Sequence, residues 1–471
     1  MSDPIEYDDR MSEGDALLWQ VESDPQLRST VASVWTLDAA PDPKRWDAAL
    51  SDAIAAIPRL RQRVVPDPFG IAPPRWETDP HFDPAYHVRR IRVDGIGALR
   101  DLLDLAAPIA MQAFDKDRPL WEFHLVYGLA HGRTGVVMKL HHAVSDGMGM
   151  VRMTESLVEP DREPDPHRRA RREAIVPTDP QRAPLSDLDH LRDAVVHRAG
   201  SAADRAARLG RALGRGMEHL ARDPADAAAR LRDRVSSLGR LLKPASEPMS
   251  PIMTGRSLSC RFDAITLSLE ELKRAANRVD GTLNDAFVAA VAGGLRIYHE
   301  HHGQPVDELR MNMPINVREG EKGRRAGNQF VPARFLVPIG IADPLERMRA
   351  IHELVRSQRD EPALGMVDDV NAMFTRLGTR LATSLAGSMM KALDFVTSNV
   401  PGPRRSVFAS GAKIEHMFPF GPLAGSAANI TLFSYAGTLH LGINTDAAAV
   451  ADPGVFTDCL ARGVAEVLSV S

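Results

Sequence analysis

The sequence predicts an α/β protein with two domains. The chain has 471 residues, which exceeds what one hydrophobic core usually supports. Segments with strand-like alternation take turns with amphipathic helical segments in both halves of the chain. The first half ends near residue 158, and globular patterning resumes near residue 250. We therefore expect domains at 1–158 and 250–471, joined by a linker at 159–249.

Composition is that of an ordinary globular protein. Apolar residues make up 44% of the chain, charged residues make up 25%, and the net charge of −4 gives no reason to expect nucleic acid as a partner. Cys260 and Cys459 lie far apart without metal-site spacing, so we expect reduced thiols. The acidic N-terminus does not resemble a signal peptide. Prolines and glycines break the longest uncharged run, 417–445, which predicts a cytoplasmic protein whose membrane contact is at most peripheral, at the inner face of the plasma membrane.

The first half begins with alternating helices and strands. We expect helices at 15–22, 46–57 and 96–105 and a strand at 30–37. Alternation over 121–127 predicts a half-buried strand that forms a hairpin with a buried strand at 136–140. This hairpin places Trp121 in the same sheet as the two histidines that follow the second strand.

Two basic segments each allow two interpretations. The cluster at 59–63 is either a solvated helix end or a contact for phosphate. Between 191 and 243 the chain has 12 Lys or Arg and 6 Asp or Glu, and apolar spacing predicts an amphipathic helix over 188–220 and another over 231–242. Such helices either lie on an anionic membrane, where each nearby positive charge contributes about 1 kcal/mol, or pack on their own protein.

The residues that indicate chemistry follow the buried strand at 136–140. His141 and His142 are followed by Asp146 and by a glycine turn that starts at Gly147. Successive strand side chains point to opposite faces, so the two histidines point in opposite directions. This argues against a two-histidine metal site and leaves one imidazole for chemistry. The Asp146 carboxylate then holds the loop or orients the ring.

The second half repeats the alternation of strands and helices. We expect strands at 257–267, 309–317, 329–337 and 395–399, a hairpin of 430–435 with 438–444, and helices at 268–279, 286–298, 344–358, 362–393 and 453–470. Thr282 and Asp285 have the spacing of a capping box that opens the apolar helix at 286–298.

Four motifs together make this sequence resemble the wax ester synthase/diacylglycerol acyltransferase family of bacteria, part of the CoA-dependent acyltransferase superfamily. They are His-His-x-x-x-Asp-Gly at 141–147, Pro-Leu-Trp at 119–121, Thr-Leu-Asn-Asp at 282–285 and Ser-Asn-Val-Pro-Gly-Pro at 398–403. The segment at 57–63 also matches the family. The motifs occur in the family's order over nearly the whole chain, and the correspondence is least in the Arg-rich linker.

The resemblance implies a fold and a reaction. It implies two chloramphenicol-acetyltransferase-like α/β domains that meet at a central tunnel, with the histidine motif at its middle. It also implies transfer of a long acyl chain from acyl-CoA, the co-substrate, to diacylglycerol, to a long-chain fatty alcohol, or to both. No cofactor and no metal are expected. The partners would be these lipids and, if the basic helices bind it, the surface of a membrane or a lipid droplet.

The resemblance assigns roles to the two histidines, and the chemistry of the residues suggests roles for the rest of the motif. His142 would be the general base that takes the proton of the alcohol, and such help is typically worth roughly 10²–10⁴-fold. His141 would support the loop from the other face. Asp146 would fix the turn through an ion pair, for which Arg318 is our candidate. Gly147 either gives the backbone room beneath the thioester or is only a turn residue.

Other residues are candidates for positioning the substrate. The oxyanion needs a donor, and losing one typically costs about 3–4 kcal/mol of barrier. Asn284 is our first candidate and Asn399 the second, although each is equally suited to a helix cap or a turn. The segment at 426–433 suits a channel wall or an ordinary buried strand. Three further residues belong to the core or to the wall of an acyl tunnel: Pro119, Leu120 and Trp121.

Two other functions are compatible with the same motifs. Peptide-synthetase condensation domains carry the same histidine motif and form amides between carrier-bound substrates. The Pro-Leu-Trp and Ser-Asn-Val-Pro-Gly-Pro segments, and the lack of an attached carrier domain, favour the lipid enzymes. A non-catalytic protein that binds lipid surfaces is the remaining alternative, and the intact His142 and Asp146 argue against it.

Overall fold

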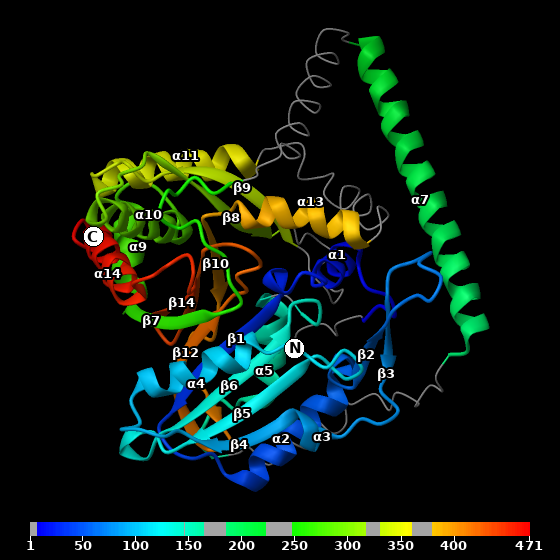
Figure 1. The fold of residues 1–471 in the computed structure, drawn as a ribbon, viewed down its shortest axis with the longest axis horizontal. Helices are drawn as coiled ribbons and strands as arrows, with labels where there is room; N and C mark the ends of the chain where they lie inside the picture. The colour runs from blue at the N-terminus through cyan, green and yellow to red at the C-terminus, as the bar shows by residue number, and fades with distance from the viewer. Residues whose placement is uncertain (1–6, 146, 164–184, 223–246, 317–329, 360–378) are drawn as a thin grey trace.

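The computed structural model describes residues 7–145, 147–163, 185–222, 247–316, 330–359 and 379–471 (Figure 1). Within these ranges the chain forms two six-stranded sheets and one small two-stranded sheet of β2 (Gln62–Val65) and β3 (Arg75–Thr78). Helices accompany both large sheets (Figure 1). The prediction of a two-domain α/β protein is therefore confirmed.

The first large sheet contains the histidine motif. Its strand order is β11-β12-β1-β6-β5-β4. The bounds of these strands are Phe408–Ala409, Ala412–Phe420, Thr30–Leu37, Thr134–His141, Trp121–Tyr127 and Val88–Arg92. β5 and β6 form the predicted antiparallel hairpin, in which Trp121 lies opposite Leu140. All eight residues of β6 are buried, as the apolar run predicted.

Five α-helices in the described residues of the first half accompany this sheet. They are α1 (Glu13–Val21), α2 (Pro43–Ala56), α3 (Pro84–His87), α4 (Leu99–Met111) and α5 (Gly147–Leu157). Helix α4 packs on β1 and β6, and α2 packs against α5. Apolar cores form on both faces of the sheet. The strand that ends in the motif is thus held by packing from two sides.

The second large sheet has the strand order β7-β14-β13-β10-β8-β9. The strands are Cys260–Ser268, Thr438–Asp446, Ala428–Tyr435, Phe395–Pro401, Glu308–Asn316 and Phe330–Pro338. Its helices are α9 (Leu269–Asn277), α10 (Leu283–His301), α11 (Pro344–Arg359), α13 (Thr379–Lys391) and α14 (Pro453–Leu468). Thr282 and Asp285 form the predicted capping box. The hairpin of β13 and β14 turns over Ala436 (φ 49°) and Gly437 (φ 85°), the left-handed pair that a two-residue turn requires.

One strand crosses between the two halves of the sequence. β12 was not predicted, and it pairs antiparallel with β1, with Met417 opposite Trp35. The sequence boundary at residue 250 therefore does not separate the two sheets, because residues 408–420 extend the first one. Alternation of apolar and charged residues covers only 412–415 and is then broken by the run of His416, Met417, Phe418 and Pro419, so the local signal for β12 is weak.

The two sheets meet where β12 packs against β13 and β14. A Cβ atom on Gly442 would lie 1.6 Å from the Pro419 carbonyl oxygen, so the two backbones touch at this point. The rings of Phe262 and Phe420 stack beside it, with centroids 3.9 Å apart. This close contact fixes the second domain against the sheet that carries the motif.

The linker contributes one long helix. α7 spans Asp187–Arg222 as a single 36-residue helix, and its glycines do not interrupt it. It extends away from the two domains (Figure 1). The helix predicted at 231–242 and the start of the one predicted at 362–393 lie outside the described residues. Within the described ranges, no helix has the length and apolarity needed to cross a membrane, and Cys260 and Cys459 are free thiols, as predicted.

Candidate active site

The histidine motif is placed by a strand that ends and a helix that begins. His141 is the last residue of β6, residues 142–144 form a turn, and Gly147 is the first residue of α5. The backbone N–H of His141 donates to the Leu120 carbonyl at 3.0 Å. Asp146 lies outside the described residues, so its ion pair stays a prediction.

His141 is a buried residue with partners on both ring nitrogens. Its side chain is 1% exposed, and Nδ1 accepts the backbone N–H of Ala143 at 3.0 Å. Nε2 lies 2.9 Å from Oε1 of Glu22. The Trp19 ring packs edge-on at 5.6 Å. These contacts enclose the imidazole of His141, and its role as a support for the loop stays a prediction.

His142 has a different environment. Its backbone N–H donates to the Ser29 carbonyl at 2.8 Å, which fixes the main chain against the start of β1. Its side chain is half-buried, whereas that of His141 is buried. The two histidines are therefore not equivalent, although β6 ends at His141 and the alternation of strand side chains does not extend to His142. A residue that is partly accessible and fixed at its backbone is a candidate for a general base.

Glu22 was not identified from the sequence, although it contacts the motif directly. Oε1 accepts the backbone N–H of Ser29 at 2.6 Å, in addition to its contact with His141. Burial raises the pKa of Glu22, but His141, the Ser29 N–H and Lys116 together outweigh burial and lower the pKa below its ordinary value. The carboxylate is thus ionised at neutral pH. No motif spacing indicates it, because it lies 119 positions before His141.

A second buried charge lies on the same face of β6. Lys139 is fully buried, its Nζ is 3.6 Å from Oε1 of Glu122, and it lies 4.3 Å from the centre of the Phe114 ring. Burial lowers the pKa of Lys139, and Glu122 opposes this shift. Phe114 also packs edge-on against His141 at 6.3 Å. The support beneath the motif is therefore charged as well as apolar.

The Pro-Leu-Trp motif lies in the core. Leu120 and Trp121 are both 0% exposed, and Pro119 is also buried. The indole Nε1 of Trp121 donates to the Leu60 carbonyl at 2.9 Å, and its ring stacks on His87 at 4.4 Å. Of the two predicted roles, the packing favours the core over a tunnel wall.

The oxyanion candidates lie in the second domain. Asn284 is in the first turn of α10, and its Nδ2 lies 3.3 Å from Sδ of Met313. It is not the helix cap, because Thr282 fills that position. Asn399 is exposed on β10, the strand that contacts α5 directly after the motif. Asn399 is therefore on an element adjacent to the motif helix, while Arg318 lies outside the described residues.

Burial bears on two further interpretations of the sequence. Arg59 is 4% exposed, stacks over Trp76 at 4.5 Å and donates to the Asp8 carbonyl at 2.6 Å. Burial lowers its pKa to about 10. Arg59 is thus neither solvated nor free to contact phosphate, whereas Arg61 and Arg63 are half-buried and both interpretations stay open for them. Most of 426–433 is buried, and residues 428–433 belong to the central strand β13.

Among the described residues, one group has the composition of a metal site. His301, His302 and Asp452 have potential ligand atoms within 4.8 Å of one another. They lie where α10 ends and α14 begins, and His302 Nε2 contacts Asp452 directly at 3.0 Å. This contact accounts for their proximity, and the group does not include the histidine motif.

Residues 11–287 match the family described as "Wax ester synthase/diacylglycerol acyltransferase catalytic domain", and residues 326–467 match "WS/DGAT C-terminal domain". A Mycobacterium tuberculosis protein named "Putative diacyglycerol O-acyltransferase Rv2484c" is 34% identical over 465 residues, which cover 98% of this chain and 92% of the relative. A second protein of that organism with the same designation, Rv3087, is 30% identical over 458 residues, or 94% of this chain and 93% of the relative.

Solved structures show the same fold. The wax ester synthase/diacylglycerol acyltransferase of Marinobacter aquaeolei aligns with a TM-score of 0.62 at 20% identity, over 97% of this chain and 98% of that one. The first condensation domain of the CDA synthetase aligns with a TM-score of 0.60 at 17% identity, over 98% and 95%. The fold and the matched family models thus define a two-domain acyltransferase. Within that class, the chain belongs to the wax ester synthase/diacylglycerol acyltransferase family.

Proposed function

We propose that this enzyme transfers a long acyl chain from acyl-CoA to the free hydroxyl of diacylglycerol, and that a long-chain fatty alcohol is its alternative acceptor. The placement of His142, a half-buried residue at the turn between β6 and α5, is the observation that carries the proposal. The names of the mycobacterial relatives support diacylglycerol as the acceptor. The reaction requires acyl-CoA as co-substrate and no bound cofactor.

In the proposed reaction, the imidazole of His142 accepts the proton of the acceptor hydroxyl as its oxygen attacks the thioester carbon. The C–O bond forms, the carbonyl electrons move to oxygen, and a tetrahedral intermediate results. When it collapses, the C–S bond breaks and the imidazolium returns the proton to the CoA thiolate. The products are the ester and free CoA, and no acyl-enzyme is formed.

The oxyanion of the intermediate needs a hydrogen-bond donor. Asn399 is supported by its exposure and by the contact of its strand with α5. Asn284 is the other candidate, and its present contact is with Met313. The proposal predicts that Asn399→Ala lowers kcat more than Asn284→Ala does.

The decisive assay supplies purified protein with labelled palmitoyl-CoA and either dipalmitoylglycerol or hexadecanol in detergent. Formation of triacylglycerol or wax ester, lost in His142→Ala, is the expected result. Turnover only with carrier-loaded acyl groups and an amine acceptor would overturn the proposal in favour of condensation chemistry. Equal turnover by the His142→Ala variant would overturn the role of the imidazole.

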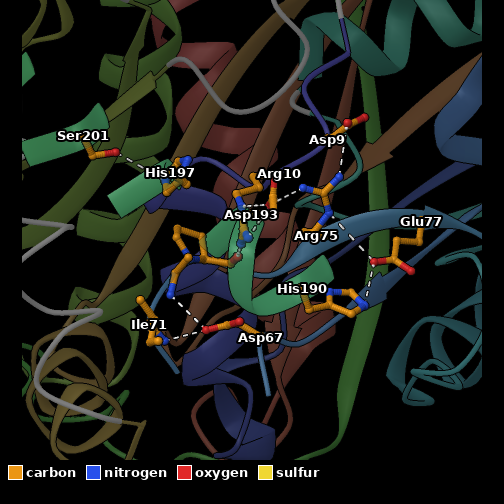
Figure 2. A network of polar contacts seen from close by, with 12 residues as sticks. Asp9, Arg10, Asp67, Ile71, Arg75, Glu77, His190, Asp193, His197 and Ser201 are labelled. Carbon is orange, nitrogen blue, oxygen red and sulfur yellow. Dashed lines mark hydrogen bonds and ion pairs between the residues drawn. The ribbon is translucent and has the colours of Figure 1, made fainter. Parts of the chain in front are cut away.

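We further propose that α7 helps the enzyme reach its lipid acceptor by contacting an anionic membrane or droplet surface. Asp193 ties the start of the helix to the first domain through Arg10 at 2.6 Å and through Arg75 (Figure 2). Arg198 attaches the same part of the helix to the Ile71 carbonyl at 3.1 Å. Beside these attachments, Leu188, Val195 and Val196 are 74%, 52% and 63% exposed. Exposed apolar residues on a helix that is attached to the first domain suit a lipid surface.

Co-sedimentation with vesicles tests this second proposal. Vesicles containing phosphatidylserine should retain the protein better than phosphatidylcholine vesicles, and high salt should release it. Replacing Val195 and Val196 by serine should weaken retention without altering turnover in detergent. Equal retention on both vesicle types, or retention unchanged by the serine replacements, would contradict it.

A further inference from the structure

Glu22 lies at the centre of the contacts that hold both motif histidines. Its Oε1 is 2.9 Å from Nε2 of His141 and accepts the N–H of Ser29 at 2.6 Å. The Ser29 carbonyl in turn accepts the N–H of His142 at 2.8 Å. We infer that Glu22 is a positioning residue for acyl transfer, acting through His141 and Ser29 on the orientation of His142. This inference rests on the proposed role of His142 as the base.

The chemistry of the contact assigns the proton on His141. Nδ1 accepts the N–H of Ala143, so the neutral ring carries its proton on Nε2, the atom that faces Glu22. The approach is close but too bent for a straight hydrogen bond, so the attraction is chiefly electrostatic. It therefore requires a charged carboxylate, which the lowered pKa of Glu22 supplies. A neutral amide of the same shape would lose most of the attraction.

The contacts are concentrated where catalysis needs precision. They hold three consecutive residues, 141–143, which include the proposed base. The contact between Glu22 and His141 is shielded from water, since the side chain of Glu22 is 9% exposed and that of His141 is 1% exposed. Displacing a catalytic group by about 1 Å can cost roughly 100-fold in rate. A substitution of Glu22 should therefore lower kcat more than it lowers the affinity for acyl-CoA.

The segment that carries Glu22 is itself held by the second domain. Ser23 Oγ is 2.9 Å from Oγ1 of Thr383, and the Asp24 carboxylate is 2.5 Å from Nζ of Lys391. Both partners belong to α13, which packs on α1. Ser23 and Asp24 thus attach the segment next to Glu22 to a helix of the second domain. The position of His142 then depends on both domains.

Steady-state kinetics of Glu22→Gln test the inference. We expect kcat to fall by about 10- to 100-fold while KM for acyl-CoA stays within about threefold. Glu22→Asp should recover part of the loss because it restores the charge at a longer distance. The matched control is Glu77→Gln, which alters another buried Glu–His contact, 3.3 Å to His190, on the attachment of α7 (Figure 2). Its kcat should remain within about twofold of the natural enzyme, and equal losses in the two variants would overturn the inference.

A double-mutant cycle shows whether Glu22 acts through His141. Glu22→Gln and His141→Gln should each lower kcat. The kcat of the double variant should equal that of the slower single variant, because both changes remove the same contact between Glu22 and His141. Independent losses that multiply would contradict the inferred route. Thermal unfolding of each variant establishes that the compared proteins are folded.

Histidine NMR supplies a readout that needs neither a variant of Glu22 nor activity. In protein labelled with ¹⁵N at histidine, the His141 resonances, assigned by their loss in His141→Gln, should show the proton on Nε2. A proton on Nδ1 would overturn the inference. If the natural enzyme transfers no acyl group, the proposed function fails, whereas the NMR result still reports on the contact with Glu22.

Discussion

Replacing Trp121 by phenylalanine would measure how much this buried residue of the Pro-Leu-Trp motif contributes to the free energy of unfolding. The change removes the indole N–H that donates to the Leu60 carbonyl and part of the surface that stacks on His87. A buried carbonyl left without its donor costs about 1–3 kcal/mol. The lost burial and the small cavity add about 1–2 kcal/mol. We therefore expect the free energy of unfolding to fall by about 2–5 kcal/mol.

The assay is guanidinium unfolding followed by circular dichroism, with the shift in midpoint compared at a constant slope. Trp35→Phe is the matched control, because Trp35 is also buried and its indole donates within its own strand to Ser33. Turnover with acyl-CoA chains of different length should keep the same preference in Trp121→Phe. Unchanged stability together with an altered chain-length preference would refute the reasoning and place Trp121 in the acyl path.

Three further changes have defined outcomes. His142→Ala should lower kcat/KM by roughly 10²–10⁴-fold with unchanged unfolding temperature, and a loss below about threefold would exclude it as the base. Gly442→Ala should lower the unfolding temperature and weaken contact between the sheets, because its Cβ would lie 1.6 Å from the Pro419 carbonyl oxygen; limited proteolysis of a folded variant at the natural rate would contradict this. Burial lowers the pKa of His440 from 6.5 to about 4 in the folded protein. Because the unfolded chain protonates His440 at the higher pH, the free energy of unfolding decreases as the pH falls from 6.5 towards 4. This loss, about 3 kcal/mol at most, should disappear in His440→Leu when unfolding is measured across that range.

Local patterns predicted most elements of the fold. β1 has the bounds that alternation indicated, and the hairpin of β5 and β6 has the predicted pairing. α10 begins at the capping box formed by Thr282 and Asp285. These signals depend on residues that are close together in the sequence, so they can be recognised without the tertiary structure. Helix α7 also formed over the range that apolar spacing predicted. Its four glycines each cost about 1 kcal/mol of helix stability relative to alanine, which does not interrupt a helix of 36 residues.

Long-range contacts were not predicted. β12 pairs with β1 although nearly 380 positions separate them. Arg59 looked solvated, yet it lies beneath Trp76. Glu22 looked like one more acidic residue at a helix end, and only folding brings it to His141. Each of these three contacts joins segments that are distant in the sequence. The periodicity of a segment does not indicate which distant segment it will contact.

The sequence by itself determined the α/β class and the buried strand that leads to the two histidines, because local apolar patterning indicates a strand without reference to the rest of the chain. The tertiary structure decided which histidine is buried, which carboxylate holds it, and that a strand from the second half completes the first sheet. Those outcomes depend on packing energies between residues far apart in the chain, which are defined only after the chain has folded.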